Sequence, residues 1–216
     1  MSGAFRLKVC GITRAADAAM ALAQGVEFLG VNCWSGSPRF VPAERRAALL
    51  REIPAAKRVA VTVNPTVAEA AALLAEGFAI VQAHFDPSEK TCDPAALSAK
   101  LGAARLWLAP KLADGAEWPA ALLPLASGFV HDAHAKGAYG GTGQRSDWSR
   151  FQALKSRHPS ALWILAGGLS PENIAEAAKT GAGCYDLNSG IELAPGLKSA
   201  EKLSALVEVL HKNTQS

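Results

Sequence analysis

The segment FRLKVCGITRAADA, residues 5–18, contains the smallest unit of the fold. Residues 6–10 have the apolar character of a short strand, and Gly11 interrupts that strand. Residues 16–23 follow with the alanine-rich spacing of a helix. The segment therefore predicts a strand, a tight turn and a helix, with the thiol of Cys10 on the last residue of the strand.

The same order repeats along the whole chain. Further strands are predicted at 28–33, 58–63, 79–84, 105–109, 128–131, 161–166 and 184–187. Helices are predicted at 42–51, 67–75, 94–101, 147–157, 171–179 and 199–211, with a weaker one near 117–125 and a short one after residue 190. Strands that alternate with helices form a parallel sheet with right-handed crossovers, and eight such units close into a barrel. We therefore predict a single (β/α)8 TIM barrel over residues 1–216.

Composition excludes several classes of protein. Half of the 216 residues are apolar, and the formal charge of +3 is not gathered into any block, so neither nucleic acid nor a membrane surface is an expected partner. The four cysteines are far apart, and their spacing suits neither a metal site nor a disulfide framework. No leader or membrane-spanning segment is recognised. We expect a cytoplasmic protein with reduced thiols and no bound metal.

Chemistry in such barrels gathers where strands end and the following loops begin. Cys10 ends the first strand, and Arg39 lies in the loop after the second. Gln82 and His84 end the fourth strand, where they either support the floor of a pocket or simply pack. Asp132 follows the sixth strand, and strand alternation turns the neighbouring His131 to the opposite side.

Glycine-rich turns follow the last three strands, and turns of this kind allow backbone N–H groups to surround an anion. Loops after the seventh and eighth strands are the usual phosphate site of the barrel. No P-loop motif occurs, and no dinucleotide fingerprint follows the first strand. A phosphorylated small molecule is therefore the expected ligand, without a nucleotide cofactor. The predicted phosphate-binding residues are Gly141, Gly143, Gly167, Gly168, Asn188, Ser189 and Gly190.

Several short motifs occur in a specific order: KVCGIT, SGSPRFV, VTVN, VQAH, VHDAHA with GGTG, LAGGLSPENI and DLNSGIE with PGLKS. Together they closely resemble the phosphoribosylanthranilate isomerase family of tryptophan biosynthesis, over residues 8–198. The resemblance implies an Amadori rearrangement of N-(5-phosphoribosyl)anthranilate to 1-(2-carboxyphenylamino)-1-deoxyribulose 5-phosphate. It also implies a general base at Cys10, a general acid at Asp132, an arginine facing the anthranilate carboxylate at Arg39, and no cofactor.

The residue types suit these roles. A thiol has a reference pKa of about 8.5, which puts a thiolate base within reach of neutral pH. Asp132 must be protonated to donate to a sugar oxygen, which requires a raised pKa. Arg39 offers two parallel donors to a planar carboxylate. Without the motifs, a buried strand-end cysteine would be read as a core residue, and Asp132 and Arg39 as a turn cap and a solvated charge.

Some positions depart from the family pattern. Asn32 replaces an aliphatic or aromatic residue near the end of the second strand, Ala83 and Phe85 replace leucine and glycine after VQ and VQAH, and Asn188 replaces a serine. Two alternatives stay open. One is the related histidine-pathway isomerase, which has an aspartate where this chain has Cys10. The other is a phosphate-binding barrel that has lost catalysis. The oligomeric state, monomer or homodimer, is also open.

Overall fold

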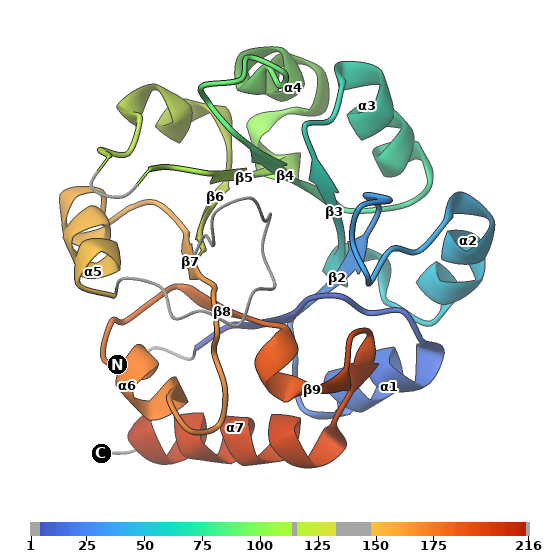
Figure 1. The fold of residues 1–216 in the computed structure, drawn as a ribbon, viewed down its shortest axis with the longest axis vertical. Coiled ribbons are helices and arrows are strands. Elements are labelled where there is room, and N and C mark those ends of the chain that lie inside the picture. Colours follow the sequence, from blue (N-terminus) through green and yellow to red (C-terminus); the bar gives the residue numbers. More distant parts are fainter. Residues whose placement is uncertain (1–4, 114–115, 133–147, 215–216) are drawn as a thin grey trace.

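The computed structural model describes residues 5–113, 116–132 and 148–214. Within them eight parallel strands pair in sequence order and the last pairs with the first, so the sheet is a closed barrel. Figure 1 shows the strands around the centre with the helices outside them. The fold is the predicted (β/α)8 barrel. The strands are β1 Leu7–Val9, β2 Phe28–Asn32, β3 Arg58–Val63, β4 Ile80–Phe85, β5 Leu106–Pro110, β6 Gly128–His131, β7 Trp163–Leu165 and β8 Cys184–Leu187.

The outer layer consists of helices with alanine-rich or amphipathic faces. They are α1 Ala15–Ala23, α2 Ala43–Arg51, α3 Val67–Ala75, α4 Pro94–Leu101, α5 Trp148–Arg157, α6 Ile174–Ala178 and α7 Ala200–Thr214. Local signals set several ends. Thr66 and Glu69 form a capping box at the start of α3. Asp93 caps α4, and Pro94 occupies its first turn. The predicted bounds of α3 and α4 are confirmed to the residue.

Two predicted helices differ from the structure, and a hairpin occurs that was not predicted. The weak helix near 117–125 is a 3-10 helix, η3 Ala120–Leu125, with Pro124 inside it. The helix predicted at 171–179 starts only at Ile174, because the Asn173 side chain is bonded to the turn that precedes it. After β8 a short 3-10 helix, η4 Ser189–Ile191, leads into a hairpin of β9 Glu192–Ala194 and β10 Leu197–Lys198, which was not predicted.

Two hydrophobic cores hold the barrel together. The larger lies between the strands and the helices. The smaller fills the inside of the barrel, where Trp107 meets Phe28 edge to face with ring centroids 4.9 Å apart. Gly128 makes room for this indole, because a Cβ there would approach the Trp107 ring to 2.6 Å. Among the described residues, side chains fill the lower part of the barrel, and the cavity described below opens at the carboxyl ends of the strands.

The C-terminal elements close the ring. α7 packs against α6 and α1, and the β9–β10 hairpin lies near α1 in Figure 1. The four cysteines are free thiols. Over the described ranges, no helix has the length and apolar character needed to cross a membrane.

Candidate active site

A cavity of about 270 Å³ opens at the carboxyl ends of the strands. Its walls come from the ends of β1 to β4, from Asp132 after β6, and from the turns after β7 and β8. It contains nearly all the described residues that the sequence singled out. Gly141 and Gly143 lie outside the described residues.

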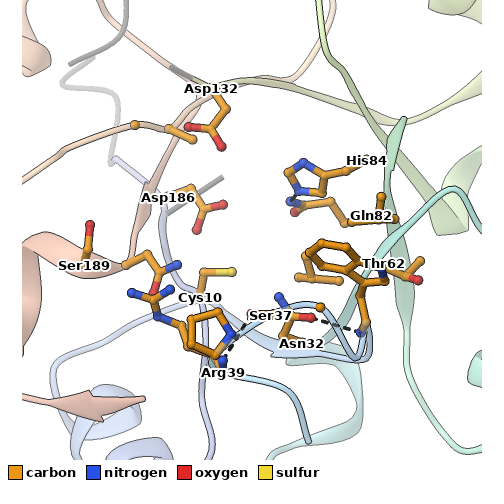
Figure 2. Close-up of a pocket in the computed structure, with 18 of the residues that line it drawn as sticks. Cys10, Asn32, Ser37, Arg39, Thr62, Gln82, His84, Asp132, Asp186 and Ser189 are labelled. Carbon is orange, nitrogen blue, oxygen red and sulfur yellow. Dashed lines mark hydrogen bonds between the residues drawn. The ribbon is translucent and has the colours of Figure 1, made fainter. Parts of the chain in front are cut away.

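Cys10 continues the barrel for one residue beyond β1, because its backbone N–H donates to the Leu187 carbonyl at 2.8 Å. Gly11 then turns the chain away with φ of 72°, a conformation that favours glycine. The thiol is 8% exposed and faces the cavity (Figure 2). Gly30 on the neighbouring strand leaves space for it, because a Cβ there would come within 3.2 Å of Sγ. Cys10 therefore lies where the sequence predicts, at the end of the first strand and in the cavity.

A buried ion pair supports the thiol from below. Lys8 on β1 is fully buried, and its Nζ lies 2.6 Å from Oδ2 of Asp186 on β8. Burial raises the pKa of Cys10, and the Lys8 ammonium opposes this effect. Burial alone would lower the pKa of Lys8, but Asp186 and Cys10 together raise it, so the lysine carries its charge beside the thiol. Sequence reasoning gave neither Lys8 nor Asp186 a role, although a charged residue inside a short apolar strand is a usable signal.

Asp132 is the first residue after β6 and lines the same cavity as Cys10. Figure 2 shows its carboxyl group directed into the cavity on the far side of Asp186 from Cys10. His131, one residue earlier, instead packs edge-on against Phe151 of α5, with ring centroids 5.8 Å apart. The predicted alternation, with His131 on the opposite side, is therefore confirmed.

Gln82 and His84 lie two residues apart on β4 and so share the inner face of the barrel. Both are buried and both line the cavity. Gln82 Nε2 lies 2.8 Å from His84 Nε2, so the two side chains fix one another. The choice between support of the pocket floor and simple packing stays a prediction.

Arg39 reaches the cavity because the loop after β2 folds back on itself. Ser37 Oγ accepts a hydrogen bond from the Arg39 backbone at 3.1 Å. The Arg39 guanidinium donates from Nε and Nη2 to the Glu192 carboxylate, at distances of 2.6 to 3.1 Å. The bidentate edge expected to bind a substrate is therefore already used, and the edge carrying Nη1 is the one that remains.

Glu192 links three parts of the site. Besides Arg39, it accepts from Lys198 Nζ at 2.8 Å and from the Gly196 backbone at 3.0 Å. Lys198 Nζ also donates to Asn188 Oδ1 at 2.9 Å, which fixes the orientation of that amide. Burial alone would raise the pKa of Glu192, but the Arg39 and Lys198 contacts outweigh it and lower the pKa to about 2. Sequence analysis missed this network.

Replacing Glu192 by glutamine should lower the free energy of unfolding at pH 7 by about 3 kcal/mol, because two buried cations lose their counter-charge. Because folding lowers the pKa of Glu192, its contribution to the free energy of unfolding is fully present above the ordinary carboxyl pKa. This contribution is lost as the pH falls towards about 2. Urea unfolding from pH 7 to pH 2 should show the two proteins converging in acid. The exposed Glu201→Gln is the control and should change little; equal stability of Glu192→Gln and wild type at pH 7 would contradict the expectation.

The turns after β7 and β8 form the remaining wall, through Gly167, Gly168, Asn188, Ser189 and Gly190. Gly167 and Gly168 have φ of 91° and 61°, and a Cβ at Gly190 would lie 2.0 Å from the Leu169 carbonyl oxygen, so each turn needs glycine for a steric reason. Asn173 Nδ2 donates to the Gly168 carbonyl at 2.8 Å and braces the first turn. The five described residues of the predicted phosphate site therefore lie on one wall of the cavity, and their role in binding phosphate stays a prediction.

No group of three or more metal-ligating side chains occurs within the described ranges. A closed parallel barrel whose polar cavity lies at the carboxyl ends of its strands is the architecture of TIM-barrel enzymes. Fold and cavity together place the chain in the class of TIM barrels with a polar cavity at the end that carries the active site in enzymes of this fold.

Comparison with known proteins identifies the family. The protein-family model described as N-(5'-phosphoribosyl)anthranilate isomerase matches residues 7–209 of this chain. The isomerase of Bordetella avium is 38% identical, covering 96% of this chain and 95% of that protein. The crystal structure of the isomerase from Thermus thermophilus has a TM-score of 0.79 and 30% identity, covering 96% of this chain and 99% of that one. A further isomerase structure, in complex with reduced 1-(o-carboxyphenylamino)-1-deoxyribulose 5-phosphate, has a TM-score of 0.74 and 21% identity, covering 97% of this chain and 100% of that one.

The chain belongs to the N-(5'-phosphoribosyl)anthranilate isomerase family. Its activity is the conversion of N-(5'-phosphoribosyl)anthranilate to 1-(2-carboxyphenylamino)-1-deoxyribulose 5-phosphate in tryptophan biosynthesis. The family expected from the sequence is confirmed, against both alternatives.

Proposed function

We propose that Cys10 is the general base and Asp132 the general acid of this rearrangement. The observation that carries the proposal is that a thiol from β1 and a carboxyl group from the end of β6 open into one cavity (Figure 2). The same cavity is lined by the turns after β7 and β8, the usual phosphate site of the barrel. A sugar held by its phosphate there would lie within reach of both groups.

Asp132 begins the reaction in its protonated form. It gives its proton to the furanose ring oxygen as the bond between that oxygen and C1 breaks, while the nitrogen lone pair forms the double bond of a Schiff base. Asp132 shares the cavity with Asp186 and Cys10. Asp132 leaves this step as a carboxylate.

Cys10 completes the reaction. Its thiolate removes the proton from C2, and the electron pair of the C–H bond moves through C1 to the nitrogen, giving an enolamine. The proton then returns from the Cys10 thiol to C1 while the C2 hydroxyl gives its proton to the Asp132 carboxylate, which leaves the ketone at C2 and restores both groups. Burial disfavours the thiolate, and the Lys8 ammonium is the charge that opposes this effect most strongly. The steps balance with one proton donor and one proton acceptor, so no metal or organic cofactor is required.

Substrate binding uses the rest of the cavity. Gly167, Gly168, Ser189 and Gly190, with the Asn188 amide, hold the phosphate; Gly141 and Gly143 belong to the same proposal from sequence alone. Arg39 presents its remaining edge to the anthranilate carboxylate, and the Gln82–His84 pair supports the floor. The isomerase structure bound to the reduced product supports a phosphorylated ligand of this kind. Four free thiols fit a reducing cytoplasmic setting.

A kinetic isotope experiment separates the two roles. With substrate deuterated at C2, residual turnover by Cys10→Ala should show a larger primary isotope effect than wild type, because removal of that proton becomes rate-limiting. Residual turnover by Asp132→Asn should show almost none, because ring opening becomes limiting. The reversed pattern would exchange the roles and contradict the proposal. Product formation is followed by the loss of anthranilate fluorescence.

A further inference from the structure

We propose that the Asn32 side-chain amide binds the anthranilate carboxylate together with Arg39, and so helps the enzyme to select a carboxylated aromatic amine. This rests on the placement of the substrate given under Proposed function, with the phosphate at β7 and β8. It also uses the position of the reacting carbon beside Cys10, but it does not depend on Asp132 acting as the acid.

The orientation of the Asn32 amide is fixed by the backbone. The Trp34 N–H donates to Asn32 Oδ1 at 3.0 Å, and only the oxygen of an amide accepts such a bond. The two amide atoms are therefore assigned without ambiguity, and Nδ2 must point the other way. Asn32 is half-buried and lines the cavity, and Figure 2 shows its nitrogen turned towards the interior. Across the described ranges, Nδ2 makes no hydrogen bond.

The order of the strands puts Asn32 at the aromatic end of the substrate. The phosphate wall belongs to β7 and β8, and the thiol follows on β1, the next strand round the barrel. Continuing in the same direction leads to β2, which ends at Asn32. If the phosphate of the substrate lies at β7 and β8 and its reacting carbon lies at β1, its aromatic ring therefore lies at β2.

Charge explains why an additional donor is needed there. Arg39 is the nearby cation, but its Nε and Nη2 atoms are held by Glu192, an anion in the same region. A carboxylate entering beside this pair meets only part of the positive charge of the guanidinium. Asn32 Nδ2 supplies a donor without a competing anion, so one carboxylate oxygen contacts Arg39 and the other contacts Asn32.

The test is equilibrium binding of two matched ligands. The first is the reduced product, 1-(2-carboxyphenylamino)-1-deoxyribitol 5-phosphate, and the second is the anilino compound that lacks only the carboxylate. Asn32→Asp has the same shape and keeps the bond from Trp34 N–H, but it replaces the donor by an anion. Asn32→Leu is a second variant of similar size that removes donor and acceptor together.

We expect Asn32→Asp to weaken binding of the carboxylated ligand by roughly 10- to 100-fold, and that of the anilino ligand by at most about threefold. Asn32→Leu should weaken binding of the carboxylated ligand by about tenfold. In turnover, KM should rise while kcat changes little. Equal losses for both ligands would assign Asn32 a structural role only, and unchanged binding of the carboxylated ligand would also overturn the proposal. Failure of wild type to bind either ligand would instead contradict the placement of the substrate.

Discussion

Replacing Cys10 by alanine is expected to lower kcat by about three orders of magnitude while leaving the affinity for the reduced product almost unchanged. Alanine removes the only atom of this side chain that can take a proton from carbon. The backbone bond from residue 10 to the Leu187 carbonyl does not depend on the side chain, so the end of β1 should keep its position. The expected effect is therefore on chemistry and not on binding.

Cys184 provides the matched control. It belongs to the same interior cluster as Cys10 and is fully buried, but it does not line the cavity. Cys184→Ala should lose some stability through the space it leaves and keep its turnover. Fluorescence decay of phosphoribosylanthranilate measures kcat, and calorimetry measures binding of the reduced product. Near-normal turnover by Cys10→Ala would remove the thiol from the mechanism.

Replacing Asp132 by asparagine should lower kcat by a similar factor of about a thousand. Asparagine has nearly the same shape, and its amide has no proton acidic enough to transfer to the sugar ring oxygen. Without that transfer the leaving oxygen must depart as an alkoxide. Binding of the reduced product, whose ring is already open, should be nearly unaffected.

Asp86 is the control for this variant, because it follows β4 directly just as Asp132 follows β6. Its carboxylate is bonded to Ser88, with a distance of 2.6 Å to the hydroxyl, and it does not line the cavity. Asp86→Asn should therefore retain normal turnover. An Asp132→Asn enzyme that retained more than about a tenth of kcat would exclude Asp132 as the acid.

The barrel could be predicted because its information is local. Each strand is a short apolar run, and helices such as α3 and α4 carry their own caps at Thr66 and Asp93. The hairpin at 192–198 could not be predicted in the same way. Its first residue, Glu192, is held by Arg39, which is 153 residues away in sequence.

The residues of the candidate site also differ in whether local sequence signals or long-range contacts determine them. Cys10, Asp132 and the glycine turns follow from the rule that strand ends carry the chemistry of a barrel. Lys8 and Asp186 do not, because the partner that makes a buried lysine tolerable is 178 residues away. A pattern that is read along the chain places side chains on a face of the barrel. It does not say which of them pair across the ring.

These long-range pairs affect how the protein folds during synthesis on the ribosome. Lys8, Thr13 and Arg39 leave the ribosome well before their partners, because each is bonded to a residue between 186 and 196. Until β8 emerges, the nascent chain has an open sheet with two unpaired edges and a lysine without its counter-ion. The enzyme should therefore gain its cavity only after β8 and the β9–β10 hairpin have been translated, and truncated chains that end before β8 should be inactive and prone to aggregate.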